Sequence, residues 1–572
     1  MLAVVLLLPV SFAGERSEAL AQHVNKAGDG TARRFYPDDP LWVDTDTCDI
    51  PPPATFELHK SYDYFQNTFR TPGSPHGPSL NVNTLDEVPN SSWFTNRLGQ
   101  HDMTIEELLR GPDVVDGPAP GTWTVTGRPW SGITPKFTIR DSRGDTYLIK
   151  LDPLDLWELP SSVEMISTKI FHALGYNVPS DYLVNVDRSL LEIEPGATYR
   201  ASGGKKPIKP ADLDHWLRRQ VRNPDGTIRA LASKYIPGRP VGEFKYYGVR
   251  SDDPNDIFPH DRRRELRGLR VFAAWLNHDD SRALNTFDTY VEENGSRFIR
   301  HYLLDFGSNM GSGSTSAQQP RAGNEYYFEK TKIVKGIFSL GLWSRDWMHV
   351  KYPGYPAVGN FEGDFFEPAK WKPQYPHPAF SRMDAADAFW AARILSRLTD
   401  DMIRAVVKVG HISDPEAESY LTEVILKRKH KCVNYWITRT SPLDNFAVGR
   451  AAGGGTKLTF DNAAVRVGAA RPGARYSVQW SALDNLANKE QPVGAVVTLD
   501  GPAAFVPDAA WGPVDDAGDR YAVAAVDAIH PDFTHWQRPV HVTLRERSGQ
   551  LAVVGIVRPR EDPGESAPAG VQ

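Results

Sequence analysis

Residues 277–285 read NHDDSRALN, and residues 305–307 read DFG. The first stretch follows a helical pattern, and the second follows two strand patterns that flank a turn at residues 293–296. Oxygen ligands suit hard Mg²⁺ ions, and phosphoryl transfer also needs a carboxylate that faces the attacking hydroxyl. The aspartates and the asparagine of these stretches therefore predict a metal and phosphate site at the end of a helix.

The segments around these stretches predict an α+β fold. Apolar residues recur with a helical period from Asp261 to Asn277, and a helix is expected from Ser161 to Ala173, before Gly175. β-branched and aromatic residues predict short strands. These strands are expected at 123–125, 136–140, 146–151, 182–186, 230–235, 287–291 and 298–304.

His278, Asp280 and Asn285 match the catalytic-loop pattern of protein kinases, in which His-x-Asp is followed after four residues by Asn. Asp305-Phe306-Gly307 matches the second metal motif in its expected order. Residues from about 120 to 435 thus resemble the protein-kinase-like superfamily. The exported and atypical branches, such as spore-coat CotH-type and secretory-pathway kinases, are more similar than ordinary Ser/Thr kinases.

The resemblance implies a bilobal core that binds ATP or another nucleotide with Mg or Mn. It implies that Asp280 is the catalytic base, that Asn285 and Asp305 hold the metal, and that Lys150 contacts the nucleotide phosphates. Glu164 would be the ion-pair partner of Lys150. His278 is expected to pack or to donate hydrogen bonds, and not to carry a proton.

The same resemblance implies a phosphate-covering loop between two strands. Ser131, Gly132 and Lys136 are its candidate residues, although the full glycine-rich pattern of kinases is absent. Residues 234–236 would form the hinge beside the adenine.

Two departures from the kinase pattern leave the acceptor open. Asp279 replaces the arginine that usually precedes the catalytic aspartate, and no Ala-Pro-Glu follows Asp305-Phe306-Gly307. Three functions are therefore considered. The first is a phosphotransferase that acts on an unknown protein or small-molecule hydroxyl, the second is a catalytically silent binding or scaffold protein of the cell envelope, and the third is an AMP transferase on the same fold.

The first residues, MLAVVLLLPVSFA, predict a signal peptide over residues 1–21 and export to the periplasm or the outside of the cell. The net charge of −6 over 572 residues gives no electrostatic reason to expect nucleic acid. No later stretch is apolar enough to predict a membrane span. Cys48 and Cys432 do not suffice for a disulfide framework.

Composition divides the remaining chain into five predicted parts. Residues 22–118 are expected to be extended chain and turns on a larger body, and 119–245 and 246–440 are the kinase-like N-lobe and C-lobe. Strand patterns at 456–560 predict an all-β, sandwich-like domain, followed by a disordered tail at 561–572. Within the C-lobe, the basic run 427–429 is interpreted as a solvated helix face.

Overall fold

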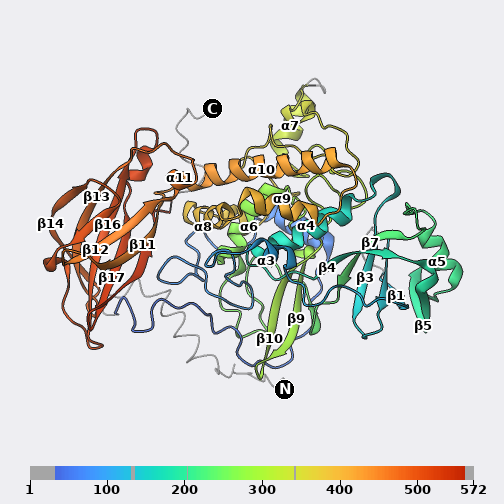
Figure 1. Ribbon diagram of the computed structural model, residues 1–572, viewed down its shortest axis with the longest axis horizontal. Coiled ribbons are helices and arrows are strands. Elements are labelled where there is room, and N and C mark those ends of the chain that lie inside the picture. The colour runs from blue at the N-terminus through green and yellow to red at the C-terminus, as the bar shows by residue number, and fades with distance from the viewer. Residues whose placement is uncertain (1–32, 130–134, 202–203, 340–342, 561–572) are drawn as a thin grey trace, which may run out of the picture.

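The computed structural model describes residues 33–129, 135–201, 204–339 and 343–560. It is an α+β protein in which most helices lie between a sheet at one end and the C-terminal strands at the other (Figure 1). The predicted signal peptide, Ser131, Gly132 and the predicted tail lie outside the described residues. The helices include α2 (Lys60–Phe69), α3 (Ile105–Arg110), α4 (Leu159–Ala173), α5 (Pro210–Leu217), α6 (Arg264–Leu276), α7 (Lys330–Phe338), α8 (Ala385–Ser396), α9 (Asp400–Lys408), α10 (Pro415–Ile437) and α11 (Ala463–Arg466).

A seven-stranded sheet carries the first candidate site residues. Its order is β4 (Asp181–Val186), β7 (Ile228–Lys234), β3 (Thr146–Leu151), β2 (Lys136–Arg140), β1 (Trp123–Arg128), β5 (Leu191–Ala201) and β6 (Gly204–Pro207). Alternate residues such as Phe137, Ile139 and Ile149 are fully buried on one face. In the antiparallel register of β2 and β3, Lys136 lies opposite Lys150. The hairpin of β5 and β6 was not predicted from the sequence.

Helix α4 packs beside this sheet and confirms the predicted helix over 161–173. Pro160 stands in its first turn, where its missing N–H costs nothing. Gly175 follows with φ 116°, and a Cβ at that position would come within 2.2 Å of the Phe94 ring. Only glycine fits this approach, so the helix ends there.

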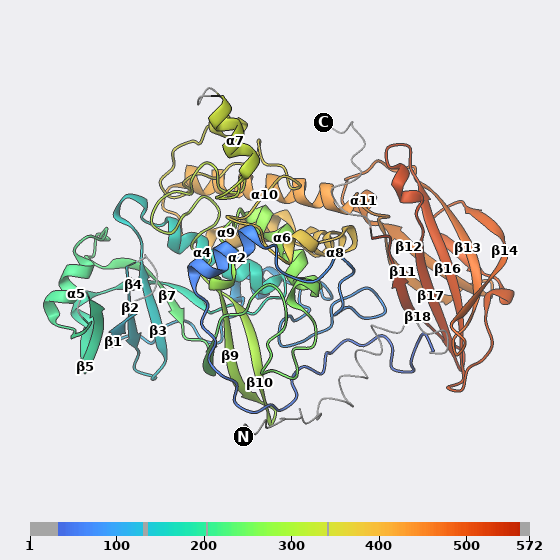
Figure 2. The ribbon, with the colours of Figure 1, turned by 180° about the vertical axis from the view of Figure 1, so that it is seen from behind.

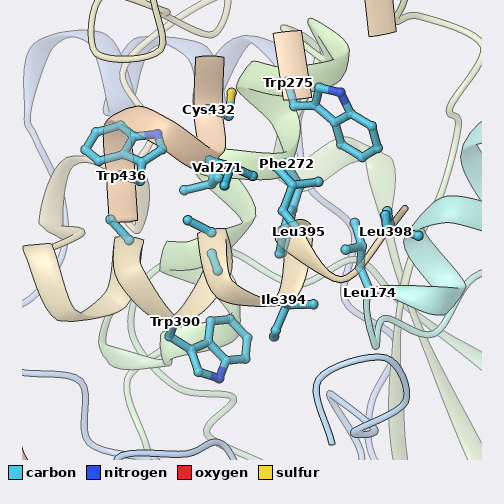
Figure 3. Close-up of a cluster of buried hydrophobic side chains, with 14 of the residues drawn as sticks. Leu174, Val271, Phe272, Trp275, Trp390, Ile394, Leu395, Leu398, Cys432 and Trp436 are labelled. Atoms are coloured by element: carbon cyan, nitrogen blue, oxygen red, sulfur yellow. The ribbon is translucent and has the colours of Figure 1, made fainter. Parts of the chain in front are cut away.

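The helices α6, α8 and α10 form the main hydrophobic core. Figure 3 shows Trp275 of α6, Trp390 of α8 and Trp436 of α10 in the same buried cluster, with Cys432 among them. The Trp275 indole N–H donates to the Ile425 carbonyl at 2.9 Å. Cys432 and the partly exposed Cys48 are both free thiols.

The interpretation of the basic run 427–429 as a solvated face is wrong for two of its three residues. Arg428 and Lys429 are buried, at 3% and 5% exposure. Arg428 donates to the carbonyls of Trp275 and Ala274 at 2.7 and 2.6 Å. The last carbonyls of a helix have no partner within the helix, and a cation that donates hydrogen bonds to them also suits the negative end of the helix dipole. Arg428 therefore stabilises the end of α6, where the NHDDSRALN stretch begins.

The predicted hairpin after that stretch is present. Strands β9 (Thr286–Glu293) and β10 (Ser296–Leu303) pair in antiparallel register, and β8 (Arg239–Gly242) joins them as the third strand. The turn at Asn294-Gly295 has positive φ at both residues. This is the backbone that a tight hairpin requires, and Asn-Gly is its preferred sequence.

The segment 33–118 is not only extended chain and turns, because it contains α2 and α3. The segment also contacts both the C-terminal strands and the helices. Phe35 is buried against Tyr521 of the C-terminal strands, with ring centroids 5.7 Å apart, and Asp86 accepts from Arg264 of α6 at 2.7 Å. Helix α3 begins with a capping box that is formed by Thr104 and Glu107.

The C-terminal part is all β apart from short helical turns. One sheet has the order β11 (Leu443–Arg450), β12 (Thr456–Asn462) and β15 (Ala503–Val506). The other has the order β14 (Lys489–Leu499), β13 (Arg475–Asp484), β16 (Asp519–Ile529), β17 (Val540–Arg547) and β18 (Gln550–Val557). Apolar residues of both sheets belong to one hydrophobic cluster.

The stretch 311–380, for which no regular elements were predicted, contains α7. This helix has no buried residue and projects from the body in both views (Figures 1 and 2). Within the ranges that the structure describes, no helix combines the length and the apolar character needed to cross a bilayer.

Candidate active site

The loop after α6 carries the first candidate catalytic residue. Asn277 ends the helix in the left-handed region, at φ 54°. Three residues later, Asp280 is buried at 8% exposure and forms an ion pair with Arg282, with 2.9 Å between Oδ1 and Nε. Burial raises the pKa of Asp280 to about 6 against the opposing charge of Arg282. A carboxyl with this pKa is ionised at neutral pH and can still accept a proton.

Asn285 is fixed by two contacts at the other end of the loop. Its side-chain amide donates to the Asp280 carbonyl at 2.8 Å. Its own carbonyl accepts from the Leu304 amide at 2.9 Å. The first bond uses the nitrogen of the side-chain amide and not its oxygen, and the second places Asn285 beside the residue that precedes Asp305.

Asp305 follows β10 in a strained backbone conformation, at φ 63°. Such left-handed non-glycine residues persist where the surrounding structure holds them, often at functional sites. The Asp305 side chain is 60% exposed and lies 3.4 Å from Lys150 Nζ. The charge of Lys150 lowers the pKa of Asp305, so this carboxylate is ionised.

Lys150 joins the sheet, α4 and Asp305. Its Nζ lies 2.5 Å from Glu164 Oε1, and both side chains are largely buried. Burial by itself would lower the pKa of Lys150, but the charges of Glu164 and Asp305 raise it. Lys136, opposite Lys150, has a pKa lowered by burial and by the charge of Lys150. Two cations therefore stand near one exposed carboxylate.

Aromatic stacking holds the loop and Asp305 together. The rings of Phe306 and Phe171 of α4 stack at 4.6 Å, and His278 lies 5.6 Å from Phe306. Burial lowers the pKa of His278 to about 4, so the imidazole is neutral at pH 7. The ring contacts agree with the prediction that His278 packs.

Asp279, which stands where kinases have arginine, points into a buried polar contact. Gln318 Nε2 donates to its Oδ1 at 2.9 Å. Burial, together with the charge of Asp280, raises the pKa of Asp279 to about 7. Asp279 thus ties the loop to the segment that follows Asp305-Phe306-Gly307.

Two residues near the site were not predicted from the sequence. Ser314 lines the same small cavity as Lys150, Glu164 and Asp305. Asp181 begins β4 and is fully buried; burial and the charge of Glu164 raise its pKa to about 8. No local signal marks Asp181, since an aspartate at a strand start is usually a turn residue. The Gly-Ser repeat at 311–314 resembles any flexible loop, so the sequence does not single out Ser314.

The structure therefore brings together Lys150, Glu164, Asp305, Asn285 and Asp280, with Lys136 beside them. Ser131 and Gly132 lie outside the described residues. The arrangement offers two cations for a polyanion, oxygen ligands for a divalent cation and a carboxylate base.

No family model matches this chain, and no curated protein matches its sequence. Among solved structures, the chain is similar to the Helicobacter pylori proinflammatory kinase CtkA at 12% sequence identity, over 55% of this chain and 98% of that chain. The TM-score is 0.28. At this TM-score the similarity carries no weight, and the function proposed below rests on the residues of this chain.

Proposed function

We propose that this chain is an exported kinase-like phosphotransferase, which moves a phosphoryl group from ATP or another nucleotide to a hydroxyl with the help of Mg or Mn. The seven-stranded sheet with α4 would be the N-lobe, and the helices from α6 to α10 would be the C-lobe. One observation carries the proposal: Lys150 Nζ lies within 3.4 Å of carboxylates from two other elements, Glu164 and Asp305. Export is proposed from the apolar start of the sequence.

The donor set fits a metal that arrives with a nucleotide. Among the residues that the structure describes, no group of three His, Cys, Asp or Glu side chains could hold a metal. Mg²⁺ commonly takes only one or two protein oxygens and completes its shell with phosphates and water. Asp305, which is ionised and exposed, and the neighbouring Asn285 supply such oxygens. A bound metal would offset the negative charge of the phosphates.

The chain's own residues would orient the acceptor and accept its proton. Lys150 is held by Glu164 at 2.5 Å, so its charge is fixed in place before a phosphate binds. Asp280 would accept a hydrogen bond from the acceptor hydroxyl and take its proton as the oxygen attacks. A pKa of about 6 keeps Asp280 ionised at pH 7 and leaves it basic enough for this role.

Thermal unfolding of the full chain with ATP and MgCl₂ or MnCl₂ tests the proposal. We expect a rise in melting temperature that needs both components, because a ligand that binds only the folded state stabilises it. A control variant, Asp500→Ala, removes an exposed aspartate from the C-terminal part and should show the same rise as the parent chain. If no nucleotide shifts the melting temperature with either metal, the phosphotransferase proposal is wrong and the silent scaffold is favoured.

ATP labelled on the α- or the γ-phosphate then separates the two enzyme functions. Transfer of the γ label to protein or small-molecule hydroxyls supports phosphoryl transfer. Transfer of the α label supports AMP transfer and would contradict the proposal.

A further inference from the structure

Helix α2 has its polar and aromatic residues on unexpected sides. Asp63 and Asn67, one turn apart, are its buried residues. Tyr62, Phe65 and Phe69 form a stripe on the outside, and the two phenylalanines are 57% and 55% exposed. An ordinary surface helix buries its apolar stripe, so an exposed aromatic stripe indicates a contact with another molecule.

The helix is held firmly in this orientation. The Asp63 carboxylate accepts from the Tyr375 hydroxyl at 2.6 Å and from Asn67 Nδ2 at 2.9 Å. The Tyr64 ring meets the Tyr375 ring edge-on at 5.5 Å. Turning α2 to bury its aromatic stripe would break the buried hydrogen bond from Tyr375 to Asp63 and the ring contact between Tyr64 and Tyr375, which makes the exposed stripe a fixed surface.

The stripe continues onto the segment that precedes α7. Phe69 lies 5.2 Å from Phe328, which is 38% exposed, and Tyr64 lies 6.5 Å from Tyr327. Phe65 stacks on Phe69 at 5.9 Å. The exposed rings of α2 and Phe328 therefore form one continuous surface, which we call the aromatic strip: Tyr62, Phe65, Phe69 and Phe328. Figure 2 shows helix α2, which carries the first three residues of the aromatic strip.

One end of the aromatic strip is close to the candidate catalytic base. Lys60 begins α2, and its charge acts on the Asp280 carboxyl. Tyr375, which donates to Asp63, directly follows Gln374, and the Gln374 backbone N–H donates to the Asp279 carbonyl at 2.9 Å. The ten residues of α2 extend about 15 Å from this end, which equals about five residues of an extended chain.

Exposed cations stand at both ends of helix α2. Lys60 and Arg70 are exposed, and neither forms an ion pair with any residue in the described ranges. Arg321 adds a third cation, 3.9 Å above the Tyr327 ring. Apolar rings between unpaired cations complement a ligand that carries both apolar side chains and negative charge.

We infer that the aromatic strip docks an acidic protein segment with apolar side chains, and that it presents a hydroxyl residue of that segment to Asp280. This inference rests on the proposed phosphotransferase function and names its acceptor class. A peptide fits better than a single small molecule because the strip is long and linear and leads away from the buried Asp280.

Fluorescence anisotropy of labelled serine peptides with the full chain tests the inference without any transfer reaction. One peptide set carries Leu or Phe with Asp or Glu to one side of the serine. A second replaces the acidic residues with Lys or Arg, and a third replaces the apolar residues with Gly or Asn. We expect binding of the first set alone.

The variant Phe65→Ala with Phe69→Ala should bind the first set at least about 10-fold more weakly, since each ring loses buried apolar contact. The control is Phe505→Ala, an exposed phenylalanine of β15 with Lys457 near its ring. It should bind like the parent chain. Both variants should keep the parent melting temperature, because all three rings are exposed.

Three results would overturn the inference: equal binding of the second or third peptide set, unchanged binding by the double variant, or no peptide binding. Sedimentation with phosphatidylglycerol vesicles adds a fourth, because vesicle binding that is lost in the double variant would make the aromatic strip a membrane surface. The ATP-dependent melting shift, measured on the same samples, separates the two proposals. A shift without peptide binding contradicts only the docking inference, and peptide binding without a shift contradicts only the phosphotransferase.

Discussion

Replacing Lys150 with methionine removes one charge from a buried pair and keeps an apolar side chain of similar length. Lys150 Nζ and Glu164 Oε1 are 2.5 Å apart, and the two side chains are 16% and 4% exposed. Removing one partner of a buried ion pair costs about 3–5 kcal/mol, because the other charge is left without compensation. Since Lys150 keeps some solvent contact, we expect about 3 kcal/mol of lost stability. The contact with the exposed Asp305 adds at most about 1 kcal/mol.

A second substitution isolates the cause of this loss. Glu164→Gln in the Lys150→Met background replaces the stranded carboxylate with a neutral amide, so the double variant should be more stable than Lys150→Met alone. We expect a coupling energy of about 2 kcal/mol or more in the double-mutant cycle. The matched control is Lys205→Met, an exposed strand lysine of β6, which should change stability by less than about 0.5 kcal/mol.

The pH dependence of the loss has a definite sign. Burial raises the pKa of Glu164, and Lys150 opposes that rise. Without Lys150, the pKa of Glu164 is higher in the folded protein than in the unfolded chain. The folded state therefore loses stability as the pH rises from the unfolded pKa to the folded pKa of Glu164. The deficit of Lys150→Met should therefore be larger at pH 8 than at pH 5.

Urea unfolding followed by tryptophan fluorescence measures these stabilities. Additive single substitutions, or a deficit that does not change with pH, would refute the assignment of Lys150 and Glu164 as a buried ion pair. The same samples give a second measurement, because Lys150→Met should also lose the ATP-dependent melting shift if Lys150 contacts the phosphates.

Four further predictions concern the site and the fold. Asp305→Ala should remove the metal-dependent part of the ATP melting shift and Asp305→Glu should keep it; an unchanged shift in Asp305→Ala would exclude the metal role. Asp280→Asn should slow transfer from labelled ATP by about 10²–10⁴ and keep the melting shift. In the parent chain the transfer rate should fall below about pH 6, as Asp280 is protonated, and a flat acid limb would contradict its role as base. Phe35→Ala should lower the free energy of unfolding by about 3 kcal/mol, because the Phe35 ring is only 5% exposed and packs against Tyr521. Val514→Ala, at an exposed position, is its control in urea unfolding.

Much of the candidate site could be predicted because its residues belong to local patterns. Asp280 and Asn285 follow a helix, Asp305 follows a hairpin, and Lys150 and Glu164 stand on a strand and on the next helix. Strand alternation and helix periodicity are set by neighbours in the sequence, so these elements were predicted at nearly the observed positions. The chemical roles of the residues remain predictions.

Other features depend on contacts between distant segments. Arg428 was interpreted as solvated because a basic run on a helix is usually exposed to solvent. In the structure α10 lies against the C-terminal end of α6, and Arg428 donates to the α6 carbonyls there. Helix α2 was missed because its buried side is polar, held by Tyr375 from far along the chain.

The sequence by itself determined most of the helices and strands around the site, the position of the loop at 277–285 between a helix and a hairpin, and the presence of an all-β region at the C-terminus. Only the tertiary structure decided that Lys150 meets both Glu164 and Asp305, that Asp181 is buried near them, and that the aromatic rings of α2 face outward. The reason is physical: local patterns fix which side of an element is apolar, whereas packing between distant segments fixes what each side meets.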